Sequence, residues 1–236
     1  MNRLNETFVY LGQQPLLWLF LTVAIFQLAS QLQRKLNTPL ANPVAIAAAA
    51  IGVILWASDT PYSQYFEGAQ FVHFLLGPAV VSLAFPLARE LPKVRRVWLP
   101  ISVSLVVGLL VAPLSVWLLC QALTLTDPVQ MSLLSKHVTS PVAMGIANQM
   151  GGIASLAAGL SVLTGIFGAI VVSPLFNRLG FVDYRARGFA TGLNCHGIGT
   201  AHAFSVHPVA GSYAVIGMAL SAALSSLLIP LLFLAR

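Results

Sequence analysis

Residues 97–125 read VWLPISVSLVVGLLVAPLSVWLLCQALTL, a stretch without one charged side chain. An α-helix needs about 20 predominantly apolar residues to cross the hydrocarbon core of a bilayer. This stretch therefore predicts a membrane-spanning helix. Seven other apolar runs are separated by polar or turn-forming residues, and each is a candidate helix: about 15–33, 39–58, 69–88, 129–150, 152–176, 188–206 and 209–235.

The composition of the whole chain agrees with this interpretation. Of the 236 residues, 58% are hydrophobic and 8% are charged, whereas about a quarter of the residues of a soluble domain are charged. The net charge of +6 does not indicate a nucleic-acid partner, because the basic residues lie between the apolar runs and form no single face. We therefore expect an all-α polytopic membrane protein, with residues 1–236 forming a single membrane domain.

The basic residues of the loops predict the orientation of the chain. Lys and Arg concentrate in the cytoplasmic loops of membrane proteins. The other loops hold mainly acidic residues, so we expect the amino terminus outside and the carboxyl terminus in the cytoplasm, in a cell inner (plasma) membrane. The ten residues assigned to the cytoplasmic side are Arg34, Lys35, Arg89, Lys93, Arg95, Arg96, Arg178, Arg185, Arg187 and Arg236.

The run at 129–150 does not fit this alternation as a simple span. Its two neighbouring runs both obey the charge rule only if 129–150 enters and leaves on the outer side, which predicts a re-entrant segment. Without it, about seven transmembrane helices remain, and two triplets of runs have opposite orientations, as in an inverted-topology repeat. A second internal similarity aligns residues 75–86 with 138–149, at Pro78 and Pro141.

Three segments interrupt the apolar pattern with polar residues, proline and glycine: 71–86, 135–152 and 188–207. Glycines within 188–207 weaken a continuous helix and let backbone amides approach a ligand. We expect discontinuous helices whose broken ends meet near the middle of the membrane and direct positive helix amino termini at an anion.

The same segments supply the candidate binding residues for an anionic substrate. Lys136 adds a positive charge, although its side chain also has the length to reach the outer interface. Polar groups buried without partners are costly, which favours hydrogen bonds to a ligand. The predicted substrate-binding residues are Pro78, Lys136, Thr139, Ser140, Pro141, Asn148, Asn194, His196, Gly197, Gly199, Thr200 and His202.

No catalytic or metal-ligating set is expected. Cys195 and the three histidines 196, 202 and 207 have no familiar zinc spacing. All six carboxylates fall in loops or at the ends of apolar runs, so none is available to orient a histidine as a base. We therefore expect neither an enzyme nor a cofactor, and coupling of transport to H⁺ or Na⁺ stays open.

Four stretches resemble the LrgB/CidB family: NPVAIAAAAIG (42–52), LLGPAVVSLAFPLARE (75–90), LSKHVTSPVAMGIANQMGG (134–152) and GFATGLNCHGIGTAHAF (188–204). The resemblance to this family extends over nearly the whole chain. Similar proteins commonly have Arg after Gly-Thr-Ala, where this chain has His202. The resemblance implies an elevator-like transporter that has a scaffold and a moving part and forms a homodimer.

The resemblance implies two different functions. Relatives linked to plastids translocate glycolate and glycerate, and bacterial relatives are connected with pyruvate and similar acids, which predicts a transporter of small monocarboxylates by alternating access. Bacterial members are also described as antiholin-like or holin-like regulators of murein hydrolase export and autolysis, acting with a small LrgA/CidA-type membrane partner. That role is the alternative prediction.

Overall fold

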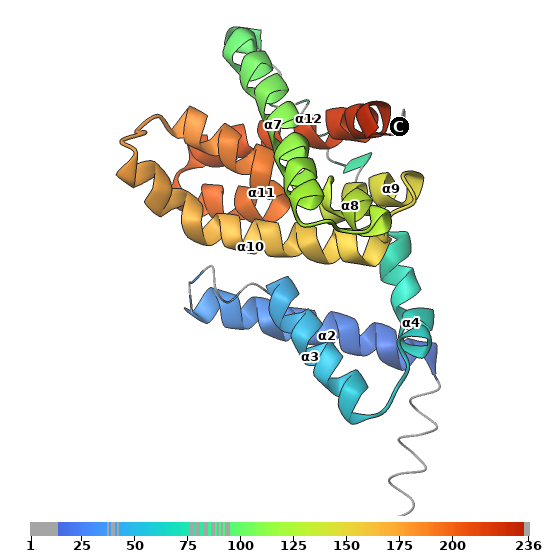
Figure 1. The fold of residues 1–236 in the computed structure, drawn as a ribbon. Helices are drawn as coiled ribbons and strands as arrows, with labels where there is room; N and C mark the ends of the chain where they lie inside the picture. Colours follow the sequence, from blue (N-terminus) through green and yellow to red (C-terminus); the bar gives the residue numbers. More distant parts are fainter. Residues whose placement is uncertain are drawn as a thin grey trace, which may run out of the picture. The chain divides into compact units, whose positions relative to one another are not determined.

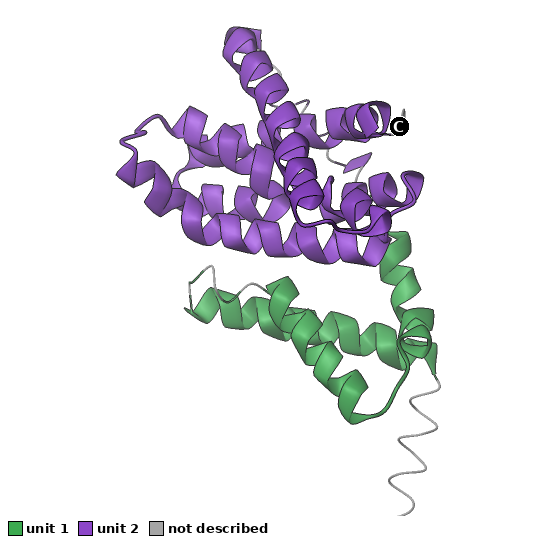
Figure 2. Cartoon of the chain, viewed as in Figure 1, with its two compact units in different colours: residues 1–79 green, residues 80–236 purple. Residues whose placement is uncertain are grey.

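In the computed structural model, the described residues are 14–36, 38, 41, 43–75, 78, 81–82, 85, 88, 90, 92 and 95–233. Across these residues the chain forms helices and no strand, which confirms the all-α prediction. The chain divides into two compact units, residues 1–79 and residues 80–236 (Figure 2).

The described residues of the first unit form three helices, and α2 packs against both of the others. Trp18 is buried and makes an edge-to-face contact with Tyr65, with ring centroids 6.0 Å apart. A side chain at Gly68 would collide with the carbonyl oxygen of Pro15, so glycine allows the close approach of two helices there. The three helices are α2 (Pro15–Leu36), α3 (Pro43–Ala57) and α4 (Tyr62–Phe74).

The second unit is built around a tightly packed pair, α11 and α12, with α10 against α11 (Figure 1). The closest approaches between α11 and α12 occur at Gly188 and Gly192, whose added Cβ atoms would meet the backbone of Ala210 and Ala214. The helices are α7 (Trp98–Ala122), α8 (Asp127–Leu133), α9 (Ser140–Gln149), α10 (Ala154–Arg178), α11 (Tyr184–Val206) and α12 (Pro208–Phe233).

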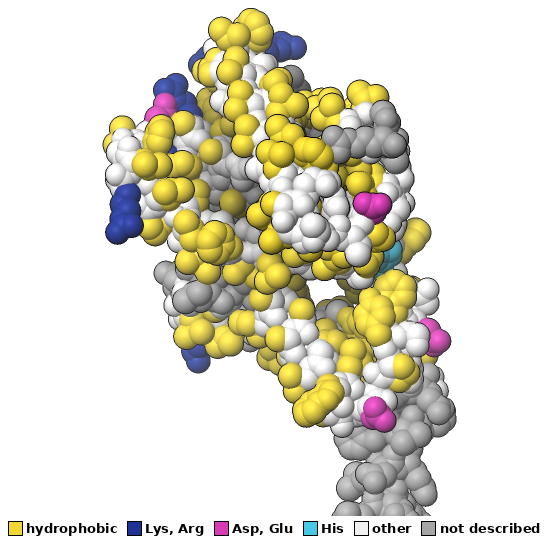
Figure 3. All heavy atoms as spheres, viewed as in Figure 1, with side chains coloured by type: hydrophobic (Ala, Val, Ile, Leu, Met, Phe, Trp, Pro, Cys, Tyr) yellow, Lys and Arg dark blue, Asp and Glu magenta, His cyan; other side chains and the backbone are white. Residues whose placement is uncertain are grey.

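Among the described residues, four helices are long and apolar enough to cross a bilayer: α2, α7, α10 and α12. Large apolar side chains are exposed along α7, among them Val103, Val107 and Leu110, and hydrophobic side chains cover the visible face of this helix (Figure 3). Such surfaces are stable against lipid and not against water. These features fit a multi-pass membrane protein.

Apart from the run at 69–88, the predicted apolar runs coincide with helices, but the described residues do not show seven spans. α3 has 15 residues and α4 has 13. α4 begins seven residues before the run predicted at 69–88, and most of residues 76–94 lie outside the described residues. The number of spans, the inverted repeat, the elevator-like arrangement and the single-domain assignment stay predictions.

The run at 129–150 forms two short helices, α8 and α9, joined by a turn at residues 134–139. Leu134, Ser135 and Val138 of this turn are fully buried. With 10 residues, α9 is about 15 Å long, about half of the hydrocarbon core. A pair of short helices is the geometry that a re-entrant segment requires, although its path through a membrane stays a prediction.

Candidate functional site

α11 is interrupted at His196. The backbone of this residue has φ 42° and ψ −136°, whereas the rest of the helix is regular. A non-glycine residue rarely adopts a positive φ, because its Cβ crowds the backbone. The prediction of a discontinuous helix in the segment 188–207 is therefore confirmed. The two halves, 184–195 and 197–206, are each about 15–18 Å long.

Contacts with α10 hold His196 in this conformation. Its Nε2 lies 2.6 Å from the carbonyl oxygen of Ser161, which accepts a hydrogen bond from the ring. The ring packs over Gly165, where a Cβ would lie 2.6 Å from Cε1. Thr200 Oγ1 donates to the His196 carbonyl oxygen at 2.7 Å. His196 is 4% exposed, so these contacts fix a buried ring.

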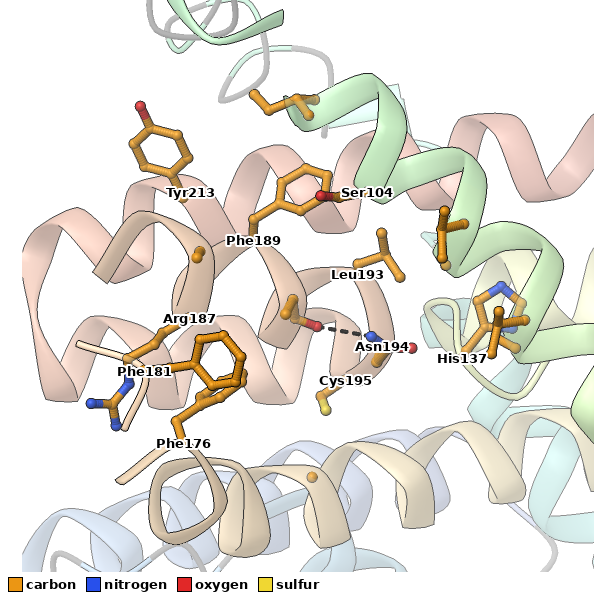
Figure 4. Close-up of a pocket in the computed structure, with 18 of the residues that line it drawn as sticks. Ser104, His137, Phe176, Phe181, Arg187, Phe189, Leu193, Asn194, Cys195 and Tyr213 are labelled. Carbon is orange, nitrogen blue, oxygen red and sulfur yellow. Dashed lines mark hydrogen bonds between the residues drawn. The ribbon is translucent and has the colours of Figure 1, made fainter. Parts of the chain in front are cut away.

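A cleft of about 990 Å³ lies beside the first half of α11. Its walls come mainly from α7, α10, α11 and the turn between α8 and α9, with Tyr213 of α12 and the loop before α11, all within residues 80–236. Figure 4 shows His137 at one end of the cleft, Asn194 and Cys195 in its middle part, and Arg187 with Phe176 and Phe181 at the other end. We call these the lysine end, after Lys136 beside His137, and the arginine end.

The lysine end presents an ammonium group together with polar side chains. Lys136 is close enough to His137 and Cys195 to interact electrostatically with both. Within the described part of the chain, no carboxylate forms an ion pair with Lys136. His137 is buried and shares a hydrogen bond of 3.1 Å with Ser225 of α12. This end can therefore attract an anion.

Asn194 lines the middle part of the same cleft. Its Nδ2 donates to the Ala190 carbonyl oxygen at 3.0 Å, one turn earlier in α11 (Figure 4). An amide nitrogen has two N–H groups, so the second remains to donate to a ligand, and Oδ1 can accept from a hydroxyl. Lys136 and Asn194 thus combine a charge with a directional hydrogen bond.

At the arginine end, aromatic rings surround the guanidinium group of Arg187. Its Cζ lies 5.6 Å from the ring centroid of Phe176 and 5.8 Å from that of Tyr184. Asp183 begins α11 and accepts from the Arg185 backbone N at 2.8 Å. The Arg185 side chain pairs with the same carboxylate at 2.7 Å, and these hydrogen bonds lower the pKa of Asp183. The charge of Arg185 is thereby paired with Asp183, whereas Arg187 contacts aromatic rings.

Comparison with known proteins identifies the family. The sequence model described as the LrgB-like family matches residues 22–234. The chain belongs to the LrgB-like family. Holin-like protein CidB of Staphylococcus epidermidis is 30% identical over 221 residues, covering 94% of this chain and 96% of the relative. CidB of Staphylococcus aureus is 31% identical with the same coverage.

An uncharacterised protein of Haemophilus influenzae is 32% identical over 217 residues, covering 92% of this chain and 94% of the relative. No solved structure matches the chain. The resemblance to LrgB and CidB expected from four sequence stretches is therefore confirmed over most of the chain. These comparisons establish family membership, and they carry no residue roles.

The structure of this LrgB-like protein brings two of the predicted site residues together, since Lys136 and Asn194 line one cleft. His196 lies behind it as a buried support. Five more predicted residues lie in the second half of α11 or at the start of α9, outside the walls of the cleft: Gly197, Gly199, Thr200, Thr139 and Ser140.

The remaining predicted residues are placed elsewhere. His202 shares a hydrogen bond of 3.0 Å with the neutral side chain of Ser173 on α10. Pro141 is in the first turn of α9, and Asn148 is exposed near its end. Pro78 belongs to the other compact unit. The substrate-binding roles of all these residues stay predictions.

Most residues that line the cleft were not among the predicted set, including His137, Arg187 and Phe176. Arg187 was interpreted only as a sign of topology. A helical pattern does connect it to the site, because Arg187, Ala190 and Asn194 are spaced by three and four residues and share one face of α11. His137 and Phe176 have no comparable signal, since their positions depend on how separate helices pack.

Proposed function

We propose that this LrgB-like protein transports or facilitates the passage of small monocarboxylates, of the glycolate, glycerate, lactate and pyruvate class, by alternating access. The observation that carries this proposal is the lysine end of the cleft, where Lys136 has no acidic partner among the described residues and Asn194 faces the same space. An ammonium group in an apolar surrounding gains most from pairing with an anion.

A carboxylate fits the two groups chemically. One oxygen accepts from the Lys136 ammonium group, and the other accepts the free N–H of Asn194. A 2-hydroxyl or 2-oxo group then lies within reach of the Asn194 amide, which can donate or accept. The interruption of α11 at His196 supports the same proposal, because a broken helix next to a cleft is the architecture in which transporters bind ions and substrates.

In this proposal the protein is not an enzyme and has no resident cofactor. It lies in the inner membrane with its amino terminus outside. It functions as a homodimer, and H⁺ or Na⁺ can supply the driving force. The described walls of the cleft contain one carboxylate, Asp183, which is paired with Arg185 at the arginine end. A proton therefore has no carboxylate carrier at the lysine end of these walls.

Uptake into proteoliposomes tests the proposal. Labelled glycolate, lactate or pyruvate should enter vesicles that contain the protein faster than empty vesicles. Lys136→Ala should lower uptake at least tenfold, since a hydrogen bond to a charged group contributes about 1.5–3 kcal/mol, while Lys136→Arg should retain part of it. Lys35→Ala is the matched control, because Lys35 is exposed on α2 and should change uptake less than twofold.

The names of the relatives favour a second function. The staphylococcal relatives are called holin-like proteins, so this chain can instead act as an antiholin-like regulator of murein hydrolase export and autolysis with an LrgA/CidA-type partner. That function depends on surfaces and not on the cleft. Lys136→Ala should then leave lysis unchanged, whereas Val103→Trp on the exposed face of α7 should alter it.

A further inference from the structure

The wall of the cleft between its two charged ends is apolar. Leu193 and Phe189 project from α11 between Arg187 and Asn194 (Figure 4). From α7, Val111 and Ala112 line the same space, and Phe167 of α10 completes it. A ligand held by its carboxylate at the lysine end therefore meets hydrocarbon along the rest of its length.

The size of the cleft exceeds what a two- or three-carbon acid occupies. Its volume of about 990 Å³ lies at the upper end of the range of about 300–1,000 Å³ that is typical of sites for drug-sized ligands. Arg187 and Asn194 are seven residues apart in α11, which separates them by about 10 Å along the helix. A small hydroxy acid would leave the apolar wall in contact with water, which is unfavourable.

We propose that the preferred substrates are 2-oxo or 2-hydroxy monocarboxylates with a branched or aromatic apolar side chain. The carboxylate pairs with Lys136 and Asn194, and the side chain extends along Leu193 and Phe189 towards the arginine end. This inference rests on the proposed transport function and specifies its substrate class. Each additional buried carbon strengthens binding about fourfold, so a branched six-carbon acid should bind at least tenfold more tightly than pyruvate.

Competition for uptake in proteoliposomes measures this preference. 4-Methyl-2-oxopentanoate and phenylpyruvate should inhibit labelled pyruvate uptake at concentrations at least tenfold lower than unlabelled pyruvate does. Ala112→Phe should reduce this preference for the larger acids. Ala112 lines the cleft and lies one turn from Val116, which packs near the lysine end. A phenyl ring there would occupy the space that the side chain of a larger acid needs. Inhibition by the larger acids should weaken at least tenfold more than inhibition by unlabelled pyruvate does.

Ala122→Phe is the matched control on the same helix. Ala122 is exposed at the end of α7 and does not line the cleft, so its substitution should preserve the preference for the larger acids.

A direct binding measurement uses the two cysteines. Cys195 lines the cleft and Cys120 does not, so in a Cys120→Ala background N-ethylmaleimide labelling reports Cys195. 4-Methyl-2-oxopentanoate should slow this labelling at lower concentrations than pyruvate.

The possible outcomes separate this inference from the proposed function. Pyruvate uptake with equal inhibition by all the acids would overturn the apolar preference and leave carboxylate transport intact. Equal effects of Ala112→Phe and Ala122→Phe would also overturn it, because the preference would then not arise in this cleft. Uptake no faster than in empty vesicles for every acid, with unchanged Cys195 labelling, would remove transport and the inference together.

Discussion

His196 occupies a backbone conformation that suits glycine and yet carries a large side chain. Its φ of 42° and ψ of −136° cost of order 1–3 kcal/mol for a residue with a Cβ. The buried ring offsets part of this cost through its hydrogen bond to Ser161 at 2.6 Å. Histidine therefore connects the break in α11 to α10, which glycine could not do.

Comparing two substitutions at this residue tests the strain. His196→Gly and His196→Ala both remove the ring, but only glycine relaxes the backbone. We expect the glycine variant to be more stable than the alanine variant by about 1–2 kcal/mol, measured by reversible unfolding in mixed detergent micelles. In a continuous helix the order is reversed, because alanine is favoured over glycine by about 1 kcal/mol. Alanine as the more stable variant would show that α11 is regular at this position.

At this scale the sequence was informative about Lys136 and Asn194, because charged and polar groups within apolar runs stand out. It was less informative about where the helix breaks. The glycines at 192, 197 and 199 pointed to the correct segment, but the break falls on His196. The reason lies in tertiary structure, since the Ser161 carbonyl oxygen that holds the ring comes from a helix 35 residues away.

Between elements, the pair α11 and α12 depends on glycine. Gly188 and Gly192 lie against the backbone of Ala210 and Ala214, and Gly217 lies against the Phe189 carbonyl oxygen. Small residues at these positions allow the two helices to pack closely. Because these contacts are made by backbone atoms, a change of side-chain rotamer cannot relieve a clash there, and the whole helix would have to move.

Substitution of one of these glycines should weaken the pair. In Gly192→Ala the new Cβ collides with the Ala214 carbonyl group, which should destabilise the protein by about 1–3 kcal/mol. Gly159→Ala on α10 is the matched control, since nothing lies within 4 Å of its Cβ and alanine should stabilise the helix by up to about 1 kcal/mol. Unfolding in detergent measures the stability of both variants. Equal stability of Gly192→Ala and Gly159→Ala would refute the close contact between α11 and α12.

Element boundaries were predictable where apolar runs end at charges or turn formers. α10 ends at Arg178, close to the predicted limit at 176, and α12 begins at Pro208. The segment 129–150 was harder, since it appears as one apolar run but contains two helices. Leu134 and Val138 are apolar because the turn between these helices is buried, so apolar character alone could not reveal the turn.

For the whole molecule, the distribution of basic residues predicts which loops face the cytoplasm. Asp59 and Arg178 are exposed at the ends of α3 and α10, and the charge rule places them on opposite sides. In a background with Cys120 and Cys195 replaced by alanine, Asp59→Cys should react with an impermeant maleimide in intact spheroplasts. Arg178→Cys should react only after permeabilisation. Labelling of both before permeabilisation would contradict the orientation.

The lengths of the longest helices have a consequence for the membrane in which the protein works. α7 and α10 have 25 residues each and α12 has 26, which makes them about 38 Å long. The hydrocarbon core of a typical bilayer is about 30 Å thick, so an upright orientation would leave apolar turns outside it. These helices must tilt, or the surrounding lipids must stretch. Lipids with longer acyl chains reduce this hydrophobic mismatch, which makes bilayer thickness a physical variable that acts on the conformation of the protein.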